Sequence, residues 1–283
     1  MAKVKIIADS TCDLSEELLE KYDITVIPLY IQLEEESYLD KLEITPAEIF
    51  AWADKNGKTP KTAAPGIDVV QGILKKFYKE ETELIYFSIS ASMSTTSNVV
   101  RLVAEDMEYD NLHIIDSMNL STGIGLQVLR AAELAAEGKS AEEIVAYMEG
   151  IRDKVRASFV IDTLTYLQRG GRCSAMTALM AGALKIKPQI SVEGGKMDVT
   201  KKYRGNIGVA IKKYLSDLEE DLKQADETRV FITHSGCSDE VIKMVYDYLE
   251  GLNYFKEIHI TTAGSVISSH CGPNTLGVLF YEK

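Results

Sequence analysis

The sequence predicts an α/β fold in which an N-terminal domain with a parallel β-sheet precedes a C-terminal α+β domain. Short apolar runs alternate with amphipathic segments through the first half of the chain, which is typical of parallel strands covered by helices on both faces. In the second half, two extended arms flank Gly194-Gly195, a pattern that indicates a β-hairpin. The 283 residues, 46% of them hydrophobic, are enough for two domains.

The first domain is expected to span residues 1–155. Its predicted strands are 4–8, 84–90 and 111–117, and its predicted helices are 15–22, 67–80, 99–107 and two segments after residue 117. The second of these two segments opens with Ser140-Ala-Glu-Glu143, the pattern of a capping box.

An excursion from the sheet is expected at about residues 25–60. The apolar run 24–33 is predicted to be one extended strand, and Pro28 favours an edge position because proline lacks the N–H that a central strand needs. The acidic and proline-containing stretch that follows is expected to hold a short helix.

The second domain is expected to span residues 156–283. Strands are predicted at 157–164, 228–234, 256–262 and 277–282, with helices at 174–184, 206–224 and 238–250. The hairpin around Gly194-Gly195 and these crossover helices distinguish this half from the first.

Composition and charge exclude several classes of protein. The net charge of −12, without a dense basic cluster, argues against a nucleic-acid partner. No apolar run is long enough for a membrane span, and the N-terminus does not resemble a signal peptide. The four cysteines form no CxxC pair, which fits reduced thiols and no zinc site. We therefore expect a cytoplasmic protein without stable membrane insertion and without a bound metal.

Nucleotide-binding patterns are incomplete. Gly138-Lys139-Ser140 resembles the end of a phosphate-binding loop, but Glu133 stands where that loop needs glycine. Gly123-Ile-Gly125 begins a dinucleotide fingerprint whose third glycine is replaced by Val128. We therefore expect no cofactor, and neither a self-contained kinase nor a Rossmann dehydrogenase.

A hydroxyl-rich turn follows the strand predicted at 84–90. Residues 87–99 read FSISASMSTTSNV. One or two of these hydroxyls would cap the following helix, or the turn would bind an anion at the helix N-terminus. Asp9-Ser10-Thr11 and Asp116-Ser117 end two other predicted strands, so all three groups are expected at one edge of the sheet, where ligands bind in such folds.

Two segments of the second half also carry candidate site residues. Arg172 follows Gly170-Gly171. It is either a surface residue after a helix C-cap, or its guanidinium group binds an anion such as a carboxylate or phosphate. His270 is expected in an organised loop between Ser268-Ser269 and Gly272-Pro273. His234 is the competing histidine, whereas His113 and His259 are interpreted as structural.

Together, the motifs resemble the DegV family of bacterial fatty-acid-binding proteins, which includes the binding subunits of fatty acid kinase. The resemblance covers essentially the whole chain. It rests, in order, on DSTCDLS, TAAP at 62–65, SISASMSTT, Asp116-Ser117, YLQRGGR, IKPQISVEGGK and VISSHCGPNTLGV. Thr95 stands where the family favours glycine.

The resemblance implies a lipid site between the two domains and identifies its residues. A long-chain fatty acid is expected, with its carboxylate bound by Thr62 and Ser94 and with Arg172 and His270 close to it. A fatty acid kinase, an ATP-binding partner protein, would phosphorylate that carboxylate to an acyl phosphate. The chain itself would then be a carrier with no catalytic residues of its own.

Two other functions remain open from the sequence. Ser94 and His270, with Asp9 or Asp116, are the residue types of a serine hydrolase triad acting on an acyl ester, although no nucleophile elbow surrounds Ser94. A regulatory protein that only senses lipid is the third possibility.

Overall fold

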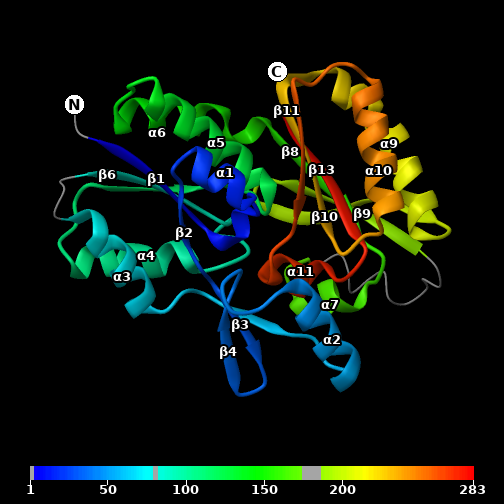
Figure 1. Ribbon diagram of the computed structural model, residues 1–283, viewed down its shortest axis with the longest axis horizontal. Coiled ribbons are helices and arrows are strands. Elements are labelled where there is room, and N and C mark those ends of the chain that lie inside the picture. The colour runs from blue at the N-terminus through cyan, green and yellow to red at the C-terminus, as the bar shows by residue number, and fades with distance from the viewer. Residues whose placement is uncertain (1–2, 79–81, 174–185) are drawn as a thin grey trace.

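A computed structural model describes residues 3–78, 82–173 and 186–283 of the chain. Within these residues, three β-sheets are surrounded by helices (Figure 1). The strands are β1 (Val4–Asp9), β2 (Thr25–Ile27), β3 (Tyr30–Leu33), β4 (Glu36–Leu39), β5 (Lys61–Ala63), β6 (Glu83–Ser88), β7 (Leu112–Asp116), β8 (Val155–Val160), β9 (Ile186–Glu193), β10 (Lys196–Arg204), β11 (Ala225–Ser235), β12 (Glu257–Thr262) and β13 (Thr275–Glu282). The helices are η1 (Ser10–Cys12), α1 (Glu16–Lys21), α2 (Pro46–Asn56), α3 (Ile67–Tyr78), α4 (Thr96–Asp106), α5 (Thr122–Ala136), α6 (Ala141–Ile151), η2 (Arg152–Lys154), α7 (Thr165–Gly170), α9 (Ile207–Lys223), α10 (Asp239–Gly251) and α11 (Ser265–Cys271).

The N-terminal sheet is parallel, in the order β2-β1-β6-β7. Its central strands are apolar on both faces because helices cover both. Ile7 on β1 packs with the helices α3 and α4, whereas Ile6 and Ala8 point to the opposite face and pack with α5 and α6. The predicted α/β class is therefore confirmed, as are the helix cap at Ser15 and the capping box of Ser140 and Glu143.

The single strand predicted over 24–33 is wrong. The run divides at Pro28 into two strands. Strand β2 lies at the edge of the N-terminal parallel sheet, and β3 lies at the centre of a small sheet ordered β4-β3-β5. The N–H of Leu29 donates to the Ser10 hydroxyl at 3.2 Å instead of to a neighbouring strand. Pro28 offers no N–H, so the ladder ends there and the chain leaves toward the excursion, which includes the predicted short helix α2.

The C-terminal sheet is mixed, in the order β10-β9-β8-β13-β11-β12. Helices α9 and α10 cover one of its faces, where Tyr214 and Ile232 are buried. The other face, with Phe159 and Leu279, shares one apolar cluster with the N-terminal sheet and with α5 between them. The division of the chain into domains at residues 155 and 156 stays a prediction.

The hairpin predicted around Gly194-Gly195 is formed by β9 and β10. Both glycines have positive φ, 54° and 77°, as a tight hairpin turn requires. The Gly195 carbonyl accepts a hydrogen bond of 2.7 Å from Ser90, so the hairpin tip is attached to the hydroxyl-rich turn of the N-terminal half. The helix predicted at 174–184 lies outside the described residues.

The segment around His270 is a helix, α11, and the loop predicted there is wrong. Helix α11 lies beside α7 and α2, near the small sheet (Figure 1), and packs against β3, β5 and η1 as well. Its residues Ser265, Ser268 and Ser269 are buried. A serine-rich segment is typical of a loop, so the sequence of this segment alone does not indicate a buried helix. Within the described residues, no helix combines the length and the apolar character needed to cross a membrane.

Candidate functional site

A cavity of about 400 Å³ lies between the two large sheets. It opens at the carboxyl ends of the parallel strands, where α/β proteins of this topology bind ligands. Its wall includes apolar side chains from both halves of the chain: Leu29, Ile89, Met93, Leu120, Phe159, Leu167, Met197, Val266, Ile267 and Leu279. The volume falls in the range of small-molecule sites in proteins.

The hydroxyl groups of the deeper wall are already bonded to the protein. Thr233 meets Thr122 at 2.6 Å and Thr261 at 3.0 Å. Ser235 donates to Ser268 at 2.9 Å, and Thr275 donates to the Cys271 carbonyl at 3.0 Å. Because these groups pair with one another, the interior of the cavity presents mainly apolar surface to a ligand.

The hydroxyl-rich turn forms one side of the cavity mouth. Ser92, Ser94 and Thr95 line the cavity, and Ser94 Oγ lies 2.7 Å from Thr96 Oγ1. Thr95, the residue before α4, makes no side-chain cap hydrogen bond. The Thr96 N–H donates to Ser94 Oγ at 3.3 Å, and the Asn98 N–H donates to the Thr95 carbonyl at 3.0 Å. No carboxylate of the described chain binds this end of the helix, so the positive end of the α4 dipole is available to an anion.

Thr62 and His270 meet on the opposite side of the mouth. Thr62 Oγ1, on β5, lies 2.9 Å from Nε2 of His270, in the last turn of α11. Nδ1 of His270 is buried without a hydrogen-bond partner among the described residues. Since an unpaired buried N–H is rarer in proteins than an unpaired acceptor, we assign the proton to Nε2, which donates to Thr62. The Thr62 hydroxyl is then free to donate its own proton into the cavity.

The imidazole of His270 is neutral at physiological pH. Burial, assisted by the nearby Arg172 guanidinium, lowers its pKa to about 4. Gly170 makes this burial possible, because a Cβ at that position would lie 2.3 Å from His270 Nδ1.

Arg172 lies exposed at the mouth, directly after the C-cap Gly171 of α7. Its guanidinium donates to the Gly170 carbonyl at 2.6 Å and to the Met93 carbonyl at 3.4 Å. It makes no ion pair with any residue in the described ranges. The sequence placed Thr62, Ser94, Arg172 and His270 in one site, and all four line this cavity.

Two other helices begin near the cavity, and carboxylates of the chain itself contact the start of each. Asp13 accepts a hydrogen bond of 2.6 Å from the hydroxyl of Ser121, the N-cap residue of α5, and one of 2.7 Å from the N–H of Gly264, the N-cap residue of α11. Asp40 accepts hydrogen bonds from the first two N–H groups of α11. Of these three helix N-termini, only that of α4 has no carboxylate of the described chain bound to it.

The comparison with known families decides which family the chain represents. A family model described as "Uncharacterised protein, DegV family" matches residues 3–283. The chain belongs to the DegV family. DegV domain-containing proteins of Clostridium perfringens and Clostridium acetobutylicum are 32% and 31% identical to it, over the full length of both chains in each case.

Solved DegV structures have the same fold. A "DegV family Protein from Thermus thermophilus", whose description reports fatty acid binding, superposes with a TM-score of 0.91 at 29% identity, covering 99% of this chain and 100% of that one. DegV of Bacillus subtilis, described as a fatty acid binding protein, superposes with a TM-score of 0.87 at 27% identity, with full coverage of both chains.

The contacts in this DegV protein do not assemble a serine hydrolase triad. His270 pairs with Thr62, and Ser94 pairs with Thr96. Asp9 accepts hydrogen bonds from Thr11 and from the N–H of Ile89. Asp116, the other acid predicted for a triad, accepts hydrogen bonds from two backbone N–H groups of the described chain. Both strand-end carboxylates therefore hold the turns that build the rim.

The remaining histidines of this DegV chain lie in strands. His113 on β7 pairs with Glu83 at 2.9 Å, and His259 on β12 pairs with Glu257 at 3.0 Å. His234 borders the cavity from β11. Within the described residues, no group of three or more His, Cys, Asp or Glu side chains is arranged to hold a metal.

Sequence reasoning missed the acidic residues that surround α11. The sequence does not predict Asp13 or Asp40 as site residues, because the residues next to them in the chain form no unusual pattern. The DSTCDLS segment contains Asp13 and was the one available signal, although only as part of a family motif.

Proposed function

We propose that this protein binds one long-chain fatty acid, with the acyl tail in the cavity and the carboxylate at the N-terminus of α4. The carboxylate is then available at the mouth to a partner kinase, which converts it to an acyl phosphate. The observation that carries the proposal is the N-terminus of α4, to which no carboxylate of the described chain is bound, beside an apolar cavity, while Asp13 and Asp40 accept the N–H groups at the start of α11. A helix N-terminus favours a carboxylate.

The acyl tail supplies most of the affinity in this proposal. Each buried methylene contributes about 0.8 kcal/mol, so a tail of about fourteen methylenes contributes roughly 11 kcal/mol before the cost of association. A hydrogen bond to a charged group contributes about 1.5–3 kcal/mol. The polar groups of the mouth therefore position the headgroup rather than determine the overall affinity.

Ser94 and Thr62 donate hydrogen bonds to the carboxylate from the two sides of the mouth. The Nε2–H of His270 donates to Thr62 and so orients the threonine hydroxyl toward the ligand. Arg172, without an acidic partner in the described chain, balances the ligand's negative charge from the solvent side.

The kinase step is assigned to the partner protein. One carboxylate oxygen attacks the γ-phosphorus of ATP and forms a new O–P bond. The bond between that phosphorus and the oxygen that bridges it to the β-phosphate breaks, and its electron pair leaves with ADP. Arg172 and His270 serve this step, since negative charge grows on the headgroup and a guanidinium stabilises it better than a hydroxyl. An ATP-dependent partner also places the protein in the cytoplasm.

Known relatives support the lipid in the proposal. The solved DegV proteins of Thermus thermophilus and Bacillus subtilis are described as fatty acid binding. A related chain from Eubacterium ventriosum, 26% identical, is described as a stearic acid-binding protein.

Mass spectrometry of an organic extract of the purified protein tests the binding. We expect one long-chain fatty acid per chain. An extract without lipid, together with no uptake of added palmitic acid, would reject the carrier and leave no role for the cavity as proposed.

A pair of arginine variants tests the transfer step. Arg172→Ala is expected to retain fatty acid binding but to lose acyl phosphate formation with the cognate kinase. Arg169→Ala is the matched control, because Arg169 lies three residues earlier, in α7, donates to the Gly57 carbonyl at 3.4 Å and is not among the residues that line the cavity. Equal turnover of both variants would remove Arg172 from the transfer step, and turnover without any kinase would make the protein an enzyme. Unchanged binding without any kinase coupling would instead indicate a lipid sensor.

A further inference from the structure

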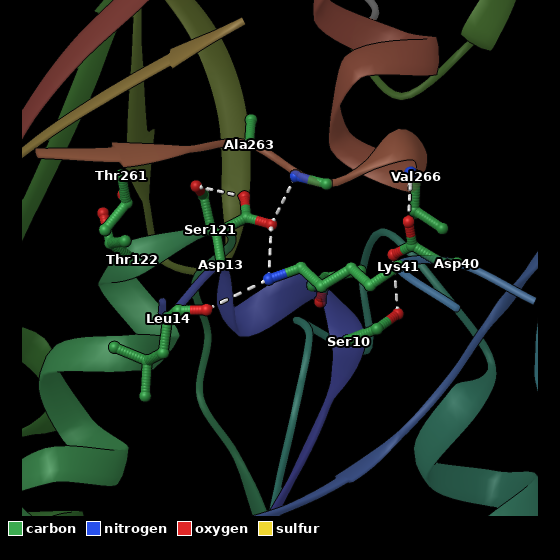
Figure 2. Close-up of polar contacts among 12 residues, drawn as sticks. Ser10, Asp13, Leu14, Asp40, Lys41, Ser121, Thr122, Thr261, Ala263 and Val266 are labelled. Atoms are coloured by element: carbon green, nitrogen blue, oxygen red, sulfur yellow. Dashed lines mark hydrogen bonds and ion pairs between the residues drawn. The ribbon is translucent and has the colours of Figure 1, made fainter. Parts of the chain in front are cut away.

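A buried acidic cluster lies at the start of α11 (Figure 2). It comprises Asp13, Asp40 and Lys41, with the carboxylates 0% and 1% exposed. Lys41 Nζ lies 3.7 Å from Asp13 and donates to the Leu14 carbonyl at 3.3 Å. Burying two carboxylates beside a single ammonium group costs free energy, and the hydrogen bonds that the carboxylates accept offset part of this cost.

Asp40 binds the N-terminus of α11 with one of its oxygens. Oδ1 accepts from the N–H of Ser265 at 2.7 Å and from the N–H of Val266 at 3.3 Å. Oδ2 accepts from the Ser10 hydroxyl at 2.7 Å, and this hydroxyl also accepts the N–H of Leu29. Asp40 thus joins α11 to the start of the excursion and to the end of β1.

Asp13 supports the same helix from the other side. Oδ1 accepts from the N–H of Gly264 at 2.7 Å, and Oδ2 accepts from Ser121 at 2.6 Å. Both Asp13 and Ser121 have positive φ, 52° in each case, a conformation that is unfavourable for residues other than glycine. The backbone is therefore held in an unusual shape where Asp13 meets the two helices.

Helix α11 depends on these contacts. It has seven residues, and Gly264, its N-cap residue, provides no side-chain cap. A helix this short is not stable by itself. Six residues after Gly264, the same helix carries His270, whose Nε2 lies 2.9 Å from Thr62, and this spacing corresponds to only about 9 Å along a helix axis. A shift at the N-terminus of α11 therefore moves the imidazole at its other end.

We propose that Asp40, supported by Asp13, is a positioning residue for the headgroup site. By fixing the N-terminus of α11, it holds the His270 ring against Thr62 and so sets the direction in which the Thr62 hydroxyl donates. The part of this inference that concerns the ligand rests on the proposed function. The part that concerns His270 does not.

The first measurement needs no ligand. The ¹⁵N shifts of the imidazole report which ring nitrogen carries the proton, and the chain has four histidines, so His270→Gln assigns the signal. Wild-type protein is expected to show one tautomer, with the proton on Nε2. Asp40→Ala is expected to show a mixture of tautomers, whereas Asp40→Asn, which keeps an acceptor for both N–H groups of α11, is expected to resemble the wild type.

Two further variants provide a milder change at Asp40 and a matched control. Ser10→Ala removes one hydrogen bond to Asp40 and is expected to change the His270 signal in the same direction by a smaller amount, even where Asp40→Ala does not fold. Asp9→Ala is the matched control, because Asp9 is equally buried but accepts hydrogen bonds from Thr11 and Ile89, neither of which belongs to α11. An unchanged His270 signal in both Asp40→Ala and Ser10→Ala, or an equal change in Asp9→Ala, would overturn the proposal.

The second measurement compares palmitic acid with 1-hexadecanol, which share the tail and differ in the headgroup. The preference of the wild type for the acid is expected to fall about tenfold in Asp40→Ala and to persist in Asp40→Asn. A purely structural role would weaken both ligands by the same factor and would contradict the proposal. A wild-type protein without any preference for the acid would reject the proposed function, while a changed tautomer in Asp40→Ala would still support the positioning of His270.

Discussion

The protonation of His270 offers a quantitative test of the site. Burial, assisted by the Arg172 guanidinium, lowers the pKa of this imidazole from 6.5 to about 4. His270→Gln removes the titrating group and keeps a donor, since the glutamine amide can bond to Thr62 in place of the Nε2–H. The variant therefore isolates the cost of protonating the folded protein.

The expected magnitude follows from the two pKa values. The unfolded chain takes up the proton as the pH falls below 6.5, whereas the folded protein takes it up only near pH 4. Folding stability from this group is therefore complete above pH 6.5 and is lost progressively between 6.5 and about 4. Integrated over that interval, the loss in the free energy of unfolding is about 3 kcal/mol.

Urea unfolding of the wild type and of His270→Gln from about pH 8 to about pH 4 measures this loss, because the difference between the two proteins cancels the other titrating groups. The difference is expected to be constant above about pH 7 and to change by about 3 kcal/mol, against the wild type, toward pH 4. A difference that does not depend on pH would show that His270 is not held neutral by its surroundings, and the assigned Nε2–H donation to Thr62 would lose its basis.

Three further predictions concern neighbouring positions. Burial raises the pKa of Asp13 to about 6, so the contribution of this carboxyl to folding stability is lost as the pH rises through 6. In urea unfolding, Asp13→Asn should remove about 3 kcal/mol of the pH dependence of the unfolding free energy between pH 4 and 6. This pH dependence is opposite in sign to that of His270. Gly170→Ala would place a Cβ 2.3 Å from His270 Nδ1 and should destabilise the protein by about 1–3 kcal/mol, whereas Gly150→Ala, with open space around it, should not. Ser94→Ala should weaken palmitic acid binding by about 1–3 kcal/mol in titration calorimetry, and an unchanged affinity would exclude Ser94 from the headgroup site.

Local signals in the sequence predicted most of the regular structure. The alternation of apolar runs and amphipathic segments predicted β1, β6 and β7 with their helices, and the Gly194-Gly195 turn predicted the hairpin. These elements depend on interactions between near neighbours, such as the capping box of Ser140 and Glu143. Periodicity and caps are written in consecutive residues, so they can be interpreted without the fold.

The failures have the opposite origin. Helix α11 was predicted as a loop because its N-terminus is stabilised by Asp13 and Asp40, which are 251 and 225 positions away from the residues that they bind. The run 24–33 is predicted as one strand because the Leu29 N–H donates to the hydroxyl of Ser10, 19 positions away, and the sequence gives no sign of this hydrogen bond. A short segment without a local cap takes its conformation from distant partners.

The sequence by itself predicted which residues would form the site: Ser94 in the hydroxyl-rich turn, Arg172 after the glycine pair and His270 from the residues themselves, and Thr62 through the resemblance to the DegV family. Only the tertiary structure decided how they act together. It brought Thr62 within 2.9 Å of His270 across 208 positions, and it placed Asp13 and Asp40 at the N-terminus of α11, while no carboxylate of the described chain binds that of α4. The physical reason is that burial and the pairing of donors with acceptors depend on distances in space, which consecutive residues do not specify.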